Sequence, residues 1–358
     1  MSGYKILILG ASYGSLLASK ILFADHSVTL VCLPVEADLI NTEGFRVRMP
    51  LKERVEPIEI DSRRLPGKVT AVGANEVNPA EFDLIALAMQ EPRYGSSEWR
   101  ELLRKIARSR VPCMSIMNMP PLPYMHRVPN LDPELLKPAF TSPEIWGDFD
   151  PCTLTLCSPD PQAVRLPDEK VNVLQVTLPT NFKVARFDCE RSNDILRQLE
   201  REIDAIRYEA QGTWLELPVK LRFFESVFVP LAKWAMLMAG NYRCITEDGI
   251  RTAREAVHQD IDESRSIYNF VVNLCVRLGA TEDELVPFEK YAAAAQGLSR
   301  PASAARALDN GAWNIERVDK LVQLAAAQKG LRHSILDAIV ERVDRRLELN
   351  RRAAKTVA

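Results

Sequence analysis

Residues 4–15 have the sequence Tyr4-Lys5-Ile6-Leu7-Ile8-Leu9-Gly10-Ala11-Ser12-Tyr13-Gly14-Ser15. The apolar run from Ile6 to Leu9 has the length and character of a central parallel strand that is buried on both faces. A helical pattern follows, with apolar residues on one face at Leu16, Leu17, Ile21 and Leu22. A second strand is predicted at Val28–Leu33. Strand, tight turn, helix and strand within about 30 residues form a βαβ unit, which predicts a parallel α/β sheet.

The turn at Gly10 is a candidate dinucleotide-binding turn. In such turns the first glycine allows a tight bend, the second lets the backbone approach a pyrophosphate, and the third allows close helix–strand packing. Gly10 occupies the first position, Ser12 and Ser15 occupy the other two, and Gly14 is an additional small residue. Small residues keep the turn thin, and the helix N-terminus presents N–H groups to an anion. The predicted cofactor site therefore comprises Gly10, Ser12, Tyr13, Gly14 and Ser15.

The residues after the second strand decide between NADP and NAD in folds of this kind. An acid there binds the ribose 2′-hydroxyl, whereas an arginine favours the 2′-phosphate. Cys32-Leu33-Pro34 supplies neither, and Glu36 comes two residues late. The predicted cofactor is therefore NADP or NAD, with the choice left open.

The rest of the chain divides into two parts. Further strands are predicted at 84–88, 112–117, 171–176 and 183–187, and helices at 96–108 and from Ser192. The segment 120–167 is rich in proline, and we interpret it as a lid or site wall. After Pro218 the pattern is helical, at 223–239, 246–278, 282–295, 314–328 and 334–350. We predict a Rossmann-type dinucleotide-binding domain at 1–218 and an all-helical substrate or catalytic domain at 219–358.

Composition excludes several classes of protein. The 358 residues carry a net charge of -2, which disfavours a nucleic-acid partner or an anionic membrane partner. No apolar stretch is long enough to span a membrane, and the N-terminus does not resemble a signal peptide. The four histidines and seven cysteines show no zinc-site spacing, so no metal is predicted. Unpaired, scattered cysteines favour a reducing, cytoplasmic location.

Several segments resemble the ketopantoate reductase family, whose members pair a nucleotide-binding half with a helical half similar to that of 6-phosphogluconate dehydrogenase. Residues 39–47, Leu-Ile-Asn-Thr-Glu-Gly-Phe-Arg-Val, are similar to the family's region after the second strand. Ser115-Ile116-Met117-Asn118-Met119 resembles its strand ending in Gln-Asn-Gly, of which the Asn is kept. The most specific match is the helix Leu231–Asn241. There, Lys233 and Asn241 match a family pattern of Lys, Asn at +4 and Asn at +8, and Leu237 replaces the middle Asn.

The resemblance implies roles for individual residues. Lys233 and Glu316 are the expected catalytic residues, and Asn241, Asn118 and Ser303 are expected to bind the substrate. In the family, a Ser is followed about a dozen residues later by a Glu that belongs to a Glu-x-Asp cluster. Ser303 and Glu316 fit this spacing with one residue inserted, and Asp319 stands one position later than the Asp of the cluster. The predicted cofactor site also includes Met89, Gln90 and Asn118. We expect Asn118 to face Lys233 and Asn241 in a cleft between the domains, because pockets of this kind form at domain interfaces.

Each of these residues also has a structural interpretation. Lys233 lies in an apolar helix and would extend its ammonium to solvent. Asn241 would end a helix after Gly240, and Glu316 would form a surface ion pair within Glu316-Arg317-Val318-Asp319-Lys320. These alternatives stay open at the level of the sequence.

We therefore predict an enzyme: an NAD(P)-dependent reductase of a small 2-oxo acid, similar to 2-dehydropantoate reductase. A homodimer is a candidate assembly, and the sequence leaves the oligomeric state open. Hydride transfer to a 2-oxo acid develops negative charge on the carbonyl oxygen, and a nearby ammonium can stabilise that charge and donate the proton. One alternative is an opine-dehydrogenase-like enzyme that condenses an amino acid with a 2-oxo acid. The other is a non-catalytic dinucleotide-binding sensor.

Overall fold

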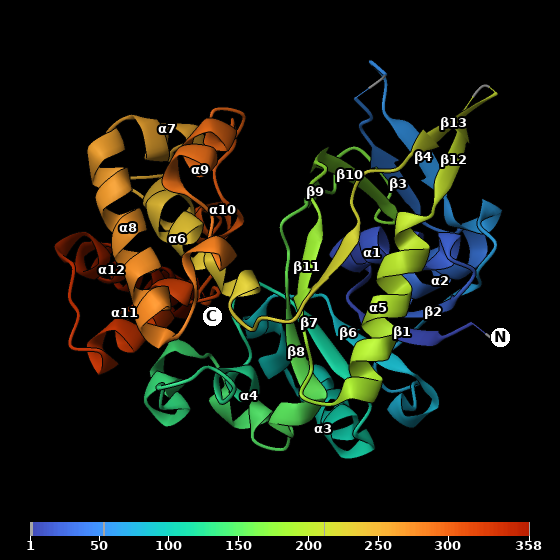
Figure 1. The fold of residues 1–358 in the computed structure, drawn as a ribbon, viewed down its shortest axis with the longest axis horizontal. Helices are drawn as coiled ribbons and strands as arrows, with labels where there is room; N and C mark the ends of the chain where they lie inside the picture. Colours follow the sequence, from blue (N-terminus) through green and yellow to red (C-terminus); the bar gives the residue numbers. More distant parts are fainter. Residues whose placement is uncertain (1–2, 53, 211, 358) are drawn as a thin grey trace. The chain divides into compact units, whose positions relative to one another are not determined.

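An eight-stranded sheet forms the centre of the N-terminal part of the chain, in the order β14-β11-β8-β7-β6-β1-β2-β5 (Figure 1). Six of its strands are parallel: β1 (Lys5–Leu9), β2 (Ser27–Val31), β5 (Val69–Val72), β6 (Leu84–Leu87), β7 (Cys113–Ile116) and β8 (Leu154–Ser158). Numbered in chain order, these six strands have the 3-2-1-4-5-6 arrangement of dinucleotide-binding sheets. The other two, β11 (Phe182–Ala185) and β14 (Leu221–Phe224), are parallel to each other and antiparallel to β8. The predicted parallel α/β sheet is confirmed.

Continuous burial explains why the central strands were recognisable in the sequence. Residues Ile6 to Leu9 of β1 and Leu84 to Leu87 of β6 are fully buried, because helices and a second sheet cover the central sheet. The helices of this part are α1 (Ala11–Phe23), α2 (Pro34–Glu43), α3 (Ser97–Ser109) and α5 (Glu190–Asp204). The first of these, α1, contacts β1 and β2 and also β3 and β10 of the second sheet.

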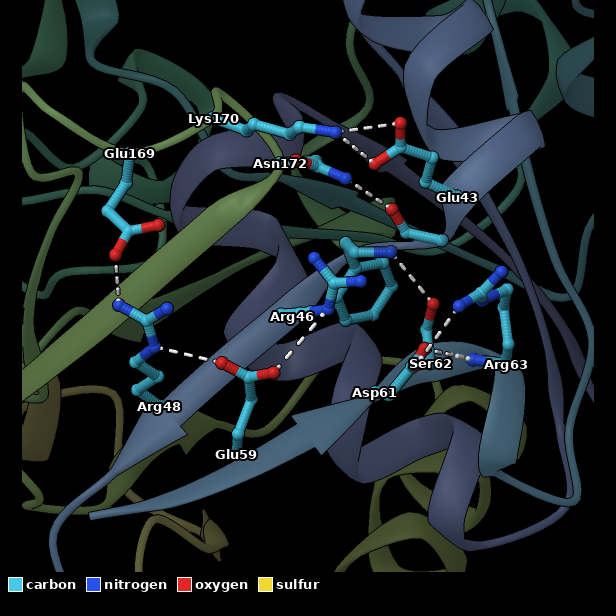
Figure 2. Close-up of polar contacts among 12 residues, drawn as sticks. Glu43, Arg46, Arg48, Glu59, Asp61, Ser62, Arg63, Glu169, Lys170 and Asn172 are labelled. Atoms are coloured by element: carbon cyan, nitrogen blue, oxygen red, sulfur yellow. Dashed lines mark hydrogen bonds and ion pairs between the residues drawn. The ribbon is translucent and has the colours of Figure 1, made fainter. Parts of the chain in front are cut away.

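The second sheet has the order β4-β3-β10-β9, with β3 (Arg46–Met49), β4 (Ile58–Asp61), β9 (Gln162–Val164) and β10 (Val173–Leu178). Alternate residues such as Val47 and Ile60 enter the core, as the two-residue repeat of a strand requires. On the other face, Glu59 accepts from Arg48 at 2.9 Å and lies 3.4 Å from Arg46 (Figure 2). Of these four strands the sequence analysis predicted β10 alone. A short hairpin, β12 (Arg207–Ala210) and β13 (Thr213–Glu216), follows α5.

The structure is a computed structural model that describes residues 3–52, 54–210 and 212–357. It divides into two compact units. The first, the sheet unit, comprises residues 1–89, 93–123 and 145–225, and the second, the helical unit, comprises 90–92, 124–144 and 226–358. The sequence analysis places one boundary at 218/219. In the structure the last boundary is at 225/226, and two earlier segments belong to the helical unit.

The helical unit contains α6 (Lys233–Met236), α7 (Ala253–His258), α8 (Ile261–Leu278), α9 (Phe288–Ala295), α10 (Ser303–Asp309), α11 (Val318–Gln328) and α12 (Ser334–Val357), with α4 (Leu122–Met125) at the point where the chain enters it. The helix predicted at 223–239 is partly wrong, since Leu221–Phe224 forms β14 and helical structure begins at Val229. The helix predicted at 246–278 is two helices, because Thr252 and Asp260 each cap a separate N-terminus.

The proline-rich segment is divided between the two units. Residues 124–144 contain a 3-10 helix at Pro133–Ala139 that packs on α11. Asp132 and Gln328 exchange hydrogen bonds there, through the Asp132 N–H at 2.8 Å and the Asp132 carbonyl at 3.0 Å. The later part of the segment contains β8 and β9, which the sequence analysis missed. Among the helices of residues 3–52, 54–210 and 212–357, none combines the length and the apolar character needed to cross a membrane.

Candidate functional site

Gly10 forms the turn between β1 and α1. Its φ is +97°, a left-handed value that only glycine adopts without strain. A Cβ at this position would lie 2.5 Å from Cγ of Met89 and 3.1 Å from the carbonyl oxygen of Ala88. The Gly10 N–H donates to the carbonyl of Val31 at 2.8 Å, which ties the turn to the end of β2. The turn therefore requires glycine at this position, as the sequence analysis predicts for the first position of a dinucleotide motif.

Gly14 is the glycine that allows α1 to approach the sheet. A Cβ here would lie 2.6 Å from Cγ2 of Ile8 and 3.4 Å from Cβ of Ala88. The sequence analysis treats Gly14 as an additional small residue and assigns the packing position to Ser15, and the structure corrects this assignment. Ser15 is buried, and its hydroxyl donates to the Ser12 carbonyl at 2.9 Å inside the first turn.

Tyr13 connects α1 to the second sheet. Its hydroxyl donates to the Pro161 carbonyl at 2.6 Å, and its ring makes an edge contact with Phe182. Burial raises the pKa of this phenol well above its ordinary value, so Tyr13 remains a neutral donor. In the structure Tyr13 therefore holds the segment that begins at Pro161, and its hydroxyl is committed to that bond.

The N-terminus of α1 is suited to an anion. Its first turn carries no acid, and no side chain in the described part of the chain caps it at Gly10. The first N–H groups of the helix and the positive end of its dipole are therefore available to a ligand. A pyrophosphate fits this arrangement, because Gly10 permits close approach of the backbone and the helix end supplies donors. Ser12, in the same turn, is half-buried.

The other predicted cofactor residues follow neighbouring strands. Met89 follows β6, and its N–H donates to the Tyr94 hydroxyl at 3.1 Å. Its side chain lies beside Gly10, as the short distance from an added Cβ shows. Asn118 follows β7 and is half-buried, and Gln90 is exposed and begins the first segment of the helical unit. Ligands of parallel α/β sheets bind at this carboxyl edge.

Lys233 and Asn241 lie at the two ends of one helical segment, α6 followed by a π-helix at Leu237–Asn241. Both residues are half-exposed, whereas Leu237 between them is buried in the core. In a regular α-helix, residues eight apart point about 80° away from each other, because two turns take 7.2 residues. A π-helix takes more residues per turn, so this segment brings Lys233 and Asn241 nearer to one face.

Tyr291 explains the π-helix. A Cβ on Gly240 would lie 2.0 Å from the Tyr291 hydroxyl oxygen, so only glycine leaves room for it. The same hydroxyl donates to the Met236 carbonyl at 3.1 Å. A side chain that bonds a helical carbonyl competes with the regular backbone ladder and locally changes the winding. Helices of this kind are often found at functional sites.

Glu316 is 5% exposed, and its backbone is held by Tyr242, the residue after Asn241. The Tyr242 hydroxyl donates to the Glu316 carbonyl and accepts the Val318 N–H at 3.0 Å. The structure therefore fixes Glu316 next to the end of the Lys233–Asn241 segment. The structural alternative placed Glu316 at the surface, and this placement is wrong, because Glu316 is buried.

Ser303 and Asp319 differ in their surroundings. Ser303 is the exposed first residue of α10, a helix that contacts the segment 237–244. Asp319 is fully buried and binds Arg317 at 2.9 Å, and Arg317 also binds Asp344 at 2.5 Å. Asp319 is thus part of a structural ion-pair network.

Sequence reasoning missed Glu91, which follows β6 and belongs to the helical unit. It is 1% exposed, and its carboxylate accepts the Thr141 N–H at 3.2 and 3.4 Å. Its own N–H lies 3.5 Å from Oε1 of Glu316. Burial, with a further contribution from Glu316, raises the pKa of Glu91 to about 7. A charged residue four positions after a buried parallel strand is the sequence signal that could have identified it. Within the described ranges, no group of three His, Cys, Asp or Glu residues could hold a metal ion.

No protein-family model matches the sequence, and no curated protein matches it significantly. Solved structures do match its fold. A 2-dehydropantoate 2-reductase from Methylococcus capsulatus has 15% identity and a TM-score of 0.60, covering 96% of this chain and 97% of that one. A dimeric ketopantoate reductase from Staphylococcus aureus has 11% identity and a TM-score of 0.60, covering 97% and 99%.

D-Mandelate dehydrogenase, solved with NADH and anilino(oxo)acetate, has 15% identity and a TM-score of 0.61, covering 97% of this chain and 99% of that one. These comparisons establish the fold over nearly the full length of the chain. The resemblance to ketopantoate reductases is therefore confirmed as a likeness of fold, with a dinucleotide-binding type of sheet unit and a helical unit.

Proposed function

We propose that this chain is an NAD(P)-dependent reductase that converts a small 2-oxo acid into the corresponding 2-hydroxy acid. The proposal rests on the segment Lys233–Asn241, because the wider winding of its π-helix brings the two positions, which carry an ammonium and an amide, nearer to one face. The fold shared with reductases and with a dehydrogenase solved with NADH supports it. The uncapped N-terminus of α1 at Gly10 also supports it, because this is the end of the fold that accepts a pyrophosphate.

The residues of the chain have separate tasks in this reaction. A bound nicotinamide coenzyme would supply the hydride. Lys233 would donate a proton to the carbonyl oxygen of the substrate and stabilise its negative charge, and solvent would then reprotonate the amine. Asn241 and Ser303 would bind the substrate, and Asn118 would contribute from the carboxyl edge of the parallel sheet. Glu316 would accept a hydrogen bond from the substrate or pair with Lys233.

The test has two stages. Titration with NADH and NADPH, followed by coenzyme fluorescence, measures whether the chain binds a nicotinamide coenzyme. A panel of 2-oxo acids, with and without added amino acids, then measures coenzyme oxidation at 340 nm. We expect oxidation with a 2-oxo acid alone.

Other results would identify a different protein. Oxidation that requires an amino acid would indicate reductive condensation of the opine type. Tight coenzyme binding without turnover on any 2-oxo acid would indicate a sensor. Failure to bind either coenzyme would contradict the assignment of the turn at Gly10.

A further inference from the structure

The carboxyl end of β2 carries an exposed apolar surface. Cys32, the first residue after the strand, is buried, but Leu33 and Val35 are 61% and 79% exposed. They lie on either side of Pro34, the first residue of α2. In sheets of this order, the residues after the second strand determine how the adenosine half of a dinucleotide is bound. An exposed apolar surface there suits the flat face of an adenine.

A charged pair lies beside this surface. Arg165 forms an ion pair with Glu36 in the first turn of α2, and their side chains are 29% and 12% exposed. Burial, with a smaller contribution from Glu36 and an opposing one from Arg165, raises the pKa of the Cys32 thiol to about 12. The charges of Glu36 and Arg165 therefore both influence the thiol of Cys32, the residue that follows β2. The sequence analysis noted Glu36 as two residues late and did not identify its partner, which lies 129 positions away.

The segment 161–165 is anchored at both ends, which fixes Arg165. At Pro161, the carbonyl accepts the Tyr13 hydroxyl of α1 at 2.6 Å. Between the anchors, β9 pairs with β10, with Val164 opposite Gln175. At Arg165, the ion pair reaches α2. The segment thus connects the N-terminal turns of the two helices that follow β1 and β2.

The charges at this edge favour a neutral ribose over a phosphorylated one. A 2′-phosphate needs an available cation, but the guanidinium of Arg165 is already neutralised by Glu36. A second carboxylate, Glu76, lies at the end of the neighbouring strand β5, where it accepts the Gly73 N–H at 3.1 Å. A ribose 2′-hydroxyl, in contrast, can donate to a carboxylate at this position.

We infer that Glu36, held in place by Arg165, selects a coenzyme with an unphosphorylated adenosine ribose, so that the chain prefers NADH to NADPH. This inference rests on the proposed function, because it concerns the coenzyme of that reaction. It goes beyond it by naming the two residues that decide the choice the sequence alone left open.

The test measures equilibrium binding, which needs no substrate. Fluorescence titrations of the full chain give dissociation constants for NADH and NADPH, and displacement of NADH by adenosine 2′-phosphate and adenosine 5′-phosphate gives an independent measure. We expect the chain to bind NADH at least about tenfold more tightly than NADPH, a difference of about 1.4 kcal/mol, because the Glu36 carboxylate can accept a hydrogen bond from a ribose 2′-hydroxyl but not from a phosphate.

Three variants make the test specific. Glu36→Gln removes the carboxylate and releases Arg165, so we expect the preference for NADH to fall by about tenfold or more. Arg165→Gln removes the cation that could contact a phosphate and releases Glu36, so we expect NADPH to bind no more tightly to this variant than to the wild type. Glu43→Gln is the matched control, because it removes another ion pair of α2, with Lys170 at 2.7 Å, at the opposite end of the helix.

Each result decides one question. Tighter binding of NADPH by the wild type, or an unchanged coenzyme preference in Glu36→Gln, would overturn the inference and leave the proposed function intact. An equal loss of preference in Glu43→Gln would also overturn it, since the effect would then belong to α2 as a whole. If neither coenzyme binds, the proposed function fails and the inference fails with it.

Discussion

Lys233 is the residue on which the proposed chemistry depends most directly. In Lys233→Ala we expect turnover to fall by about 10² to 10⁴-fold, the usual contribution of one general acid. Lys233→Arg should restore little activity, because the guanidinium does not give up a proton near neutral pH. Turnover and the thermal midpoint should be measured on the same sample. Normal turnover with reduced stability would show that Lys233 has a structural role alone within the helical unit.

Glu91 should make the stability of the helical unit depend on pH. Its pKa is about 7 in the folded chain and 4.5 when exposed, so between these values the folded state binds more protons than the unfolded state. Its stabilising contribution is therefore complete below pH 4.5 and is lost as the pH rises through 7. The loss is roughly 3 kcal/mol, because one pKa unit corresponds to about 1.4 kcal/mol.

Glu91→Gln isolates this effect, since the amide oxygen can still accept the Thr141 N–H while carrying no charge. We expect urea unfolding of this variant to depend less on pH between 4.5 and 7 than that of the wild type. The exposed Glu282→Gln is the control and should follow the wild-type curve. Identical pH dependence in the wild type and Glu91→Gln would contradict the burial of a protonated carboxyl group.

At the scale of the element, the turn before α1 gives a direct test of coenzyme binding. Ser12→Leu places a bulky side chain where a pyrophosphate would approach the helix end. We expect coenzyme affinity to be lost while circular dichroism and the thermal midpoint stay close to those of the wild type. Unchanged affinity for both NADH and NADPH would place the coenzyme elsewhere.

The π-helix gives a second test at this scale. Replacing a helical glycine by alanine ordinarily stabilises a helix by up to about 1 kcal/mol. Gly240→Ala should instead destabilise the protein by about 1–3 kcal/mol, because its Cβ would meet the Tyr291 hydroxyl at 2.0 Å. Combined with Tyr291→Phe, which removes that oxygen, the cost should be smaller than the sum of the single changes. Additive costs in urea unfolding would disprove the contact.

The elements predicted from the sequence are those whose pattern is local. Strands β1 and β6 are continuous apolar runs, and they were recognised for that reason. Strand β7 was recognised with one polar residue, Ser115, among apolar ones. Strand β8 was not, because it contains Thr155 and Ser158, although both are buried. The Thr155 hydroxyl donates to the Ala185 carbonyl at 2.8 Å, a partner that lies 30 positions away. Burial of a polar residue with a distant partner leaves no periodic signal in the sequence.

The candidate site likewise contains residues that a local pattern predicts and residues whose roles depend on distant partners. Gly10 could be predicted because the motif and its neighbours lie within a few residues. The packing role of Gly14 could not, since it depends on the distance to Ile8 and Ala88. Arg165 reaches Glu36 only through the folding of the second sheet, and Glu91 meets Glu316 across 225 positions.

At the scale of the whole molecule, the helical unit is not a single C-terminal block. The segment 124–144 belongs to it, and its 3-10 helix at Pro133–Ala139 packs on α11. We therefore expect the isolated fragment 226–358 to lack a cooperative thermal transition, and addition of a peptide of residues 124–144 to restore one. Circular dichroism melting, with and without the peptide, measures this. Equal melting in both samples would show that the fragment folds by itself. The homodimer remains a candidate assembly, which sedimentation would test.

The same division of the chain sets an order of events during synthesis on the ribosome. The sheet unit is complete once residue 225 has emerged, and N-terminal domains generally fold first while the rest is still being made. The segment 124–144 then leaves the ribosome before α11, on which its 3-10 helix packs in the finished protein. The sheet unit can therefore form during translation, whereas we expect the helical unit to wait for its last helices, and a chaperone would find its substrate in that interval.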